Sequence, residues 1–113
     1  MLKNMLVAIA CVVPFTAQAV DVEKQFENEQ IRVLKVAVHP GEEIGLHRDE
    51  YRRAVIGLQG GVISRISEDG HVNEIVFPTH GTVFLEADPE GELHRAVNNT
   101  EKTIEVIVVQ LKS

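Results

Sequence analysis

The chain has 113 residues, a formal net charge of −6 at pH 7 and a single cysteine. This length gives room for one domain. The acidic balance argues against nucleic-acid binding, because that function needs a basic surface to replace the counterions of the phosphates.

The first residues have the pattern of a secretory signal peptide. Lys3 gives a short positive start, residues 5–15 form an apolar run too short to span a bilayer, and Ala17-Gln18-Ala19 matches the small-x-small cleavage pattern. We therefore expect a signal peptide over residues 1–19 that is cleaved after Ala19. The mature domain would then cover residues 20–113, be periplasmic or secreted, and have no membrane span.

Two other interpretations of this segment are a buried N-terminal helix and a lipoprotein that carries its lipid on Cys11. The lipoprotein would keep the apolar stretch Val12 to Phe15 in the mature chain without a reason for it. Cleavage after Ala19 would instead leave no cysteine, which excludes disulfides, thiol catalysis and thiolate metal sites.

The rest of the chain consists of short β-branched runs separated by turn signals, and no run shows the 3.6-residue period of a helix. Asp69-Gly70 predicts a tight hairpin because this pair tolerates positive φ. The last two runs are expected to pair across residues 98–101. About eight strands at intervals of roughly ten residues predict an all-β sandwich or small barrel. The runs cover residues 31–39, 54–58, 62–67, 72–77, 82–85, 93–97 and 103–111.

Two separate segments contain residue types that bind metals. The first has Gly41, His47, Asp49 and the pair Gly60-Gly61, and the second reads Pro89-x-Gly91-x-x-His94-x-x-x-Asn98. A histidine and a carboxylate two residues apart on an extended segment point to the same face. A second histidine from a distant strand would complete a three-ligand cluster, which leaves metal positions open for water or substrate.

The spacing of these segments resembles the paired signature motifs of the cupin family, small β-barrels that often hold one metal. The resemblance covers about residues 26–111 and implies a single cupin-type barrel, a double-stranded β-helix or jelly roll. Asp49 stands where a second histidine is usual, and Ala54 where a glutamate ligand is usual. In a regular strand, alternation would turn Ala54 to the face opposite His47 and Asp49. If Ala54 faces the interior with Ile56 and Leu58, a bulge or bend must therefore shift the alternation between Asp49 and Ala54.

The candidate metal ligands are therefore His47, Asp49 and His94, and the candidate cofactor is a divalent transition metal: iron, manganese, zinc or nickel. Each histidine could instead be a hydrogen-bonded structural residue. Asp49 could be a solvated acid paired with Arg48, Arg52 or Arg53. No catalytic residue is identified.

Several other side chains receive a first interpretation from their positions. His39 is a possible replacement ligand, whereas Asn98 is expected to fix the turn that follows it. Arg65 or Arg95 would bind an anionic ligand only if it points inward, and strand arginines more often point outward. Phe77 and Phe84 are expected in the core.

Three functions remain open. The first is an exported metal-binding cupin that accepts a small polar molecule of unknown identity. The second is a cupin that has lost its metal and serves as a ligand-binding or dimer-forming module. The third is an iron- or manganese-dependent dioxygenase, because His47-x-Asp49 with His94 resembles a facial triad. Against an enzyme, no arginine or lysine is convincingly placed for an oxo-acid cosubstrate. A homodimer could form through an outer apolar strand such as Ile104 to Val109.

Overall fold

The computed structural model describes residues 20–112, so the expected signal peptide over residues 1–19 lies outside the described residues. Residues 20–112 contain no helix with the length and apolar character needed to cross a membrane. Their regular structure is nine β-strands: β1 (Asp21–Glu27), β2 (Ile31–Val38), β3 (Glu43–His47), β4 (Arg52–Gln59), β5 (Gly61–Ser67), β6 (Val72–Phe77), β7 (Thr82–Leu85), β8 (His94–Val97) and β9 (Ile104–Leu111).

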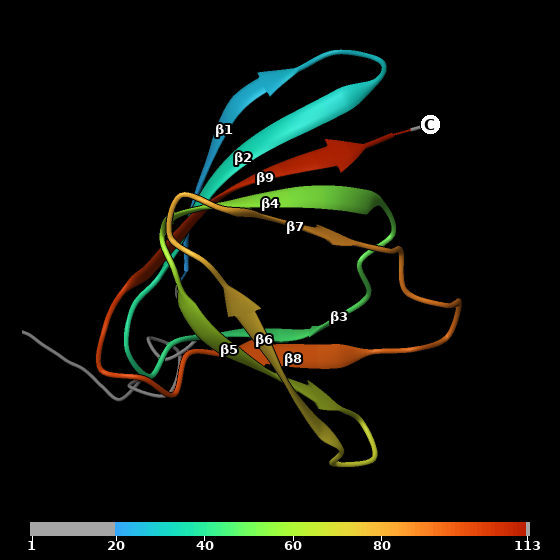
Figure 1. The fold of residues 1–113 in the computed structure, drawn as a ribbon. Helices are drawn as coiled ribbons and strands as arrows, with labels where there is room; N and C mark the ends of the chain where they lie inside the picture. Colours follow the sequence, from blue (N-terminus) through green and yellow to red (C-terminus); the bar gives the residue numbers. More distant parts are fainter. Residues whose placement is uncertain (1–19, 113) are drawn as a thin grey trace, which may run out of the picture.

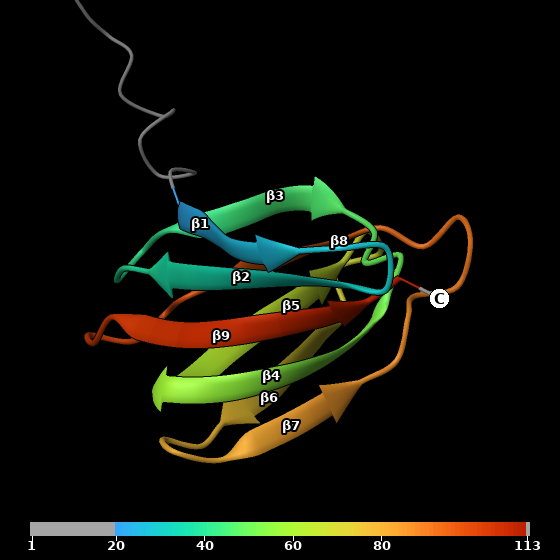
Figure 2. The same cartoon turned by 90° about the horizontal axis from the view of Figure 1, so that it is seen from above.

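The strands form two antiparallel sheets that face each other (Figure 1). One sheet has the order β1-β2-β9-β4-β7, and the other has the order β3-β8-β5-β6. Figure 2 shows the five-stranded sheet lying across the shorter one. This arrangement confirms the expected all-β jelly roll, with nine strands where the sequence suggested about eight.

The core lies between the two sheets and is built from side chains that alternate inward along each strand. Val36, Val55 and Val106 come from the five-stranded sheet, and Ile63 and Phe77 come from the other. Phe77 is therefore a core residue, as expected. Phe84 is not, since it lies on the outer face of β7 and is 49% exposed.

The expected hairpin at Asp69-Gly70 is confirmed. β5 and β6 are paired in register from Gly61 opposite Phe77 to Ile66 opposite Val72. Gly70 has a φ of 90°, which is the left-handed region that glycine enters without steric strain.

The expected pairing of the last two strands is wrong. β8 pairs with β3 and β5, whereas β9 lies between β2 and β4 in the other sheet. The turn after Asn98 therefore carries the chain from one sheet to the other. Because β9 lies in the middle of its sheet, it has no free edge, and the prediction that residues 104–109 form an outer strand for a dimer is wrong. The homodimer itself stays a prediction.

β1 was not expected from the sequence, because its residues are mostly polar and exposed. It forms the outer strand beside β2 and is joined to it by antiparallel pairing.

Candidate metal centre

Paired strands bring the two candidate histidines together. His47 is the last residue of β3 and lies opposite His94, the first residue of β8, in the register of the shorter sheet. Their ring centroids are 4.4 Å apart. Asp49 follows two residues after His47 in the loop that leads to β4. Two segments far apart in sequence therefore converge at one end of the space between the sheets.

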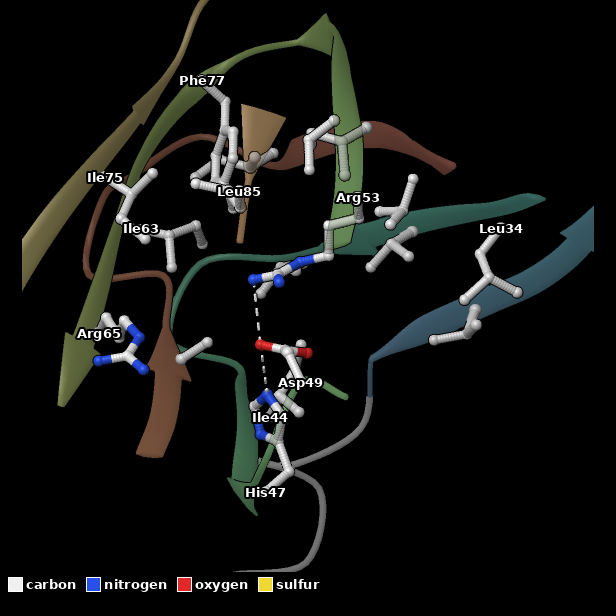
Figure 3. A pocket seen from close by; sticks show the side chains of 18 of the residues that line it. Leu34, Ile44, His47, Asp49, Arg53, Ile63, Arg65, Ile75, Phe77 and Leu85 are labelled. Atoms are coloured by element: carbon white, nitrogen blue, oxygen red, sulfur yellow. Dashed lines mark hydrogen bonds and ion pairs between the residues drawn. The ribbon is translucent and has the colours of Figure 1, made fainter. Parts of the chain in front are cut away.

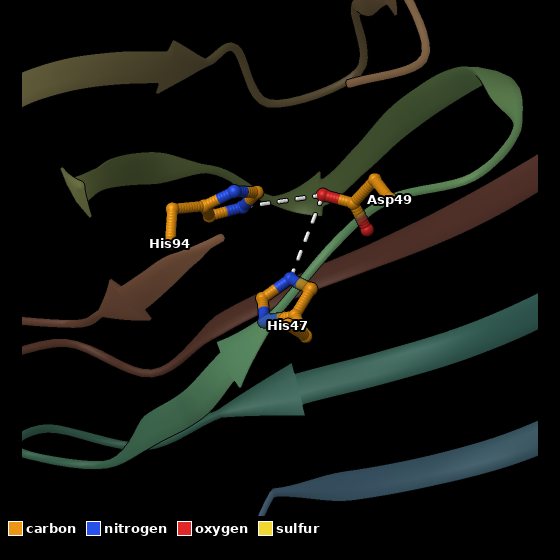
Figure 4. A group of neighbouring side chains, drawn as sticks. All are labelled: His47, Asp49 and His94. Carbon is orange, nitrogen blue, oxygen red and sulfur yellow. Dashed lines mark ion pairs between the residues drawn. The ribbon is translucent and has the colours of Figure 1, made fainter. Parts of the chain in front are cut away.

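One oxygen of the Asp49 carboxylate faces a nitrogen of each ring (Figure 4). Its Oδ2 is 3.5 Å from Nε2 of His47 and 3.3 Å from Nε2 of His94. Bonds of about 2.0–2.2 Å to one metal ion would separate neighbouring ligand atoms by roughly 3.0–3.5 Å. The spacing of these atoms therefore fits a shared metal ion. Within residues 20–112, these three residues are the one group of possible metal ligands that lie close enough together to share an ion.

The hydrogen bond on the other side of the His47 ring supports the same interpretation. Nδ1 of His47 lies 2.7 Å from the carbonyl oxygen of Gly45, and a carbonyl only accepts, so Nδ1 carries a proton. In the neutral ring, Nε2 then presents a lone pair to the negatively charged Asp49. A proton or a metal ion between the two atoms would make this contact favourable. Accordingly, the contact with Asp49 raises the pKa of His47.

His94 is the more buried of the two histidines, with 3% of its surface exposed. Its Nδ1 is 3.2 Å from Oδ2 of Asp88 but has no hydrogen bond of good geometry among the described residues. Burial, followed by the positive charge of Arg65, lowers the pKa of His94. A metal on Nε2 would leave the Nδ1 proton facing Asp88, the carboxylate–histidine–metal arrangement common in proteins.

Asp88 is a functional residue that the sequence interpretation missed. Its backbone N–H donates to the carbonyl of Asp49, and its Oδ2 accepts from the backbone N–H of Asp49, each at 2.8 Å. Its Oδ1 accepts from Nη2 of Arg65 at 2.9 Å. Asp88 thus holds the loop that carries Asp49. The sequence places Asp88 just before Pro89-x-Gly91, but nothing in that local pattern indicates these contacts.

Arg53, rather than Ala54, points from β4 toward the cluster. Nη2 of Arg53 donates to Oδ2 of Asp49 at 3.1 Å, while Ala54 lies opposite Phe84 and Val109 on the outer face. The expected inward face with Ala54 is therefore wrong. The bulge lies earlier, between Ile44 and His47 in β3, so the expected phase shift after Asp49 does not occur.

The expected pairing of Asp49 with an arginine is confirmed for Arg53, while its role as a metal ligand stays a prediction; the same carboxylate contacts both histidines. Burial disfavours its charged form, but the contact with His47 and the charge of Arg53 outweigh it. The net result is a lowered pKa for Asp49.

The remaining candidates lie away from the cluster. His39 is partly exposed and bonded to Glu42. Asn98 is fully buried, and its side chain holds the backbone of the following turn, as expected. Arg95 is paired with Glu43 outside the cavity described below.

A cavity of about 260 Å³ opens beside the cluster, between the sheets (Figure 3). Most of its lining is aliphatic, while His47, Asp49 and His94 line it together with Arg53 and Arg65. Two arginines therefore line the cavity, whereas a strand arginine was expected to point outward more often. The inward orientation of Arg65 could not be seen from its strand pattern.

No sequence model of a known family matches the chain, and no curated protein matches it in sequence. Its structure is nevertheless similar to solved cupins. A cupin domain from Bordetella pertussis Tohama I has a TM-score of 0.73 and 18% identity, over 85% of this chain and 96% of that one. An RmlC-like cupin family protein from Methanocaldococcus jannaschii has a TM-score of 0.60 and 17% identity, over 83% and 81%.

The polyketide cyclase RemF from Streptomyces resistomycificus has a TM-score of 0.59 and 18% identity, over 83% of this chain and 66% of that one. At these identities the similarity concerns the fold. The chain has the cupin fold, an all-β double-stranded β-helix with a His-Asp-His group that could hold a metal ion.

Proposed function

We propose that this chain is an exported cupin that binds one divalent transition metal through His47, Asp49 and His94 and accepts a small ligand at the open metal positions. The observation that carries the proposal is the contact of His47 with Asp49. The Gly45 carbonyl fixes the proton on Nδ1, so the lone pair of Nε2 faces a carboxylate oxygen 3.5 Å away. A metal ion would satisfy both atoms.

The side chains around the cluster would orient these ligands. The Gly45 carbonyl fixes the His47 ring, and Asp88 faces Nδ1 of His94 while it also holds the Asp49 loop. Partners of this kind set the ring orientation and the basicity of metal ligands. A bound iron, manganese, zinc or nickel ion would polarise an oxygen atom of the ligand as a Lewis acid.

A metal-free binding module is the second candidate, and the ion pair of Arg53 with Asp49 favours it. The guanidinium supplies positive charge beside the same oxygen that a metal would use. In that case His47 would keep a proton on Nε2, and the cavity alone would bind the ligand.

Metal analysis of the secreted protein separates the two candidates. The full chain would be expressed in a bacterium, purified without a tag or chelator, and its mass and metal content measured. We expect a mature chain that starts at Val20 in the periplasm or medium, with about one metal ion per chain. A mass that includes residues 1–19 would contradict the export part.

The variants His47→Ala, His94→Ala and Asp49→Asn test the ligands. We expect each alanine variant to lose the metal and Asp49→Asn to bind it more weakly. His71→Ala is the matched control, because His71 lies exposed after the β5–β6 turn. Metal retained by all three variants would place the site elsewhere. A wild-type protein that stays metal-free after loading with iron, manganese, zinc and nickel would favour the metal-free module.

A further inference from the structure

The cavity has one polar end and an apolar body. At the polar end, the His-Asp-His group, Arg53 and Arg65 line the wall. Figure 3 shows His47, Asp49 and the two arginines there. The remaining wall comes from both sheets and consists mainly of aliphatic side chains such as Leu85, together with the aromatic ring of Phe77. A ligand that fills this space must bury an apolar portion and place a polar group beside the arginines. A fully polar molecule would lose its hydration without compensation from the wall.

Arg65 has unused hydrogen-bonding capacity. Its side chain is only 19% exposed, and it donates from Nη2 to Oδ1 of Asp88 at 2.9 Å. The exposed Glu92 lies 3.8 Å away. A guanidinium has five N–H donors. Among the described residues, only one of those of Arg65 forms a hydrogen bond, the one to Asp88. A buried guanidinium with free donors at a cavity wall is suited to a carboxylate, which accepts bidentate bonds from arginine.

The charges of the polar end also favour an anion. Asp49 is paired with Arg53 and Asp88 with Arg65, so these four side chains balance one another. With neutral histidines, a divalent ion would add two uncompensated positive charges beside an apolar wall. Uncompensated charge in such surroundings is unfavourable, and an anionic ligand would offset part of it.

We infer that the cavity binds a small carboxylate with a compact apolar body, such as an aromatic or short branched-chain acid. The carboxylate lies at the end formed by Arg65, Arg53 and the metal centre, and the body packs among the aliphatic side chains between the sheets. The inference rests on the proposed function for the metal's contribution, while the arginine contribution stands by itself. The cavity of about 260 Å³ limits the ligand to molecules smaller than most drugs.

Matched ligands test the two parts of this inference. Benzoate and benzamide have nearly the same shape, but only benzoate is charged, and acetate has the charge without the apolar body. Calorimetric titration of the purified, metal-loaded protein should show benzoate binding at least tenfold more tightly than either of the other two. Benzamide binding as tightly as benzoate, or acetate as tightly, would overturn the inference.

Arginine variants then locate the carboxylate. Arg65→Gln keeps a donor for Asp88 but removes the charge, so benzoate affinity should fall tenfold or more, while Arg65→Lys should restore part of it. Arg95→Gln is the matched control, because Arg95 pairs with Glu43 outside the cavity. Metal content and unfolding temperature of each variant show whether the site and the fold are intact. Unchanged benzoate affinity in an intact Arg65→Gln variant would overturn the assignment.

The same titrations after chelator treatment keep this inference distinct from the metal proposal. If the protein holds no metal but benzoate binding depends on Arg65, the carboxylate site stands and the metal centre fails. If metal is bound through His47 and His94 but benzoate has no advantage over benzamide, the metal centre stands and the carboxylate site fails.

Discussion

Replacing Arg53 with glutamine should strengthen metal binding. Nη2 of Arg53 lies 3.1 Å from Oδ2 of Asp49, the oxygen that would bind the metal, and only 12% of the arginine side chain is exposed. With a metal–oxygen bond of about 2.1 Å, the guanidinium nitrogen would lie within roughly 5 Å of the ion. The positive charge therefore opposes a cation at this site.

The size of this effect follows from Coulomb's law. One positive charge and a dication about 5 Å apart repel by about 6–7 kcal/mol at an effective dielectric constant of about 20. Movement of the side chain and anions bound at the open metal positions would offset most of this energy. We therefore expect Arg53→Gln to bind the metal at least tenfold more tightly, or by about 1.4 kcal/mol.

The substitution also has a structural cost. Nη1 of Arg53 donates to the carbonyls of Tyr51 and Glu86 at 3.4 and 3.2 Å, and both bonds would be lost. Each is expected to contribute about 0.5–1.5 kcal/mol to stability. The metal-free variant should therefore unfold at a lower temperature than the wild type, even though the metal-loaded variant gains affinity.

Competition with a fluorescent chelator for zinc and manganese at pH 7.5 measures the affinity. Arg95→Gln is the charge-matched control, and Ala54→Glu is the positional control, because Ala54 lies on the outer face of β4. Neither control should change metal affinity. If Arg53→Gln remains folded and binds the metal no better than the wild type, the electrostatic argument is wrong, and Arg53 serves mainly to orient Asp49.

Metal affinity should decrease as the pH is lowered, and the decrease should begin above pH 6.5. The neighbouring carboxylate raises the pKa of His47, so protons compete with the metal at a higher pH than they would at a free histidine. In the chelator-treated protein, NMR titration should place the pKa of His47 above 6.5 and that of His94 below it, and the reverse order would contradict this assignment. Asn98→Ala should lower the free energy of unfolding by about 1–3 kcal/mol in denaturant titrations, because buried backbone carbonyls lose their donor; a smaller loss would mean that water replaces it. Gly57→Ala should destabilise the protein by about 1–3 kcal/mol or more, because its Cβ would clash with the Pro78 carbonyl in the β6–β7 turn. Gly45→Ala is the control, since a Cβ there meets open space, and equal unfolding temperatures of the two variants would refute the close approach.

The sequence by itself determined the features that depend on local chemistry. The β-branched runs predicted an all-β fold, and Asp69-Gly70 predicted its hairpin, because positive φ is a property of the residues in the turn. The sequence also identified the two segments that carry His47, Asp49 and His94, because the characteristic residue spacing of each segment lies within that segment. The structure brings all three together, although metal binding itself stays a prediction.

Only the tertiary structure decided which strands pair and which face each side chain occupies. β8 and β9 are neighbours in sequence but belong to different sheets, because strands distant in sequence satisfy the backbone groups of each. The bulge in β3 between Ile44 and His47 sets the phase of the strand, and Arg53 rather than Ala54 faces the cluster. One residue of slip exchanges the two faces of a strand, so alternation alone could not assign them. The role of Asp88 likewise depends on contacts with residues distant in sequence, which no local pattern encodes.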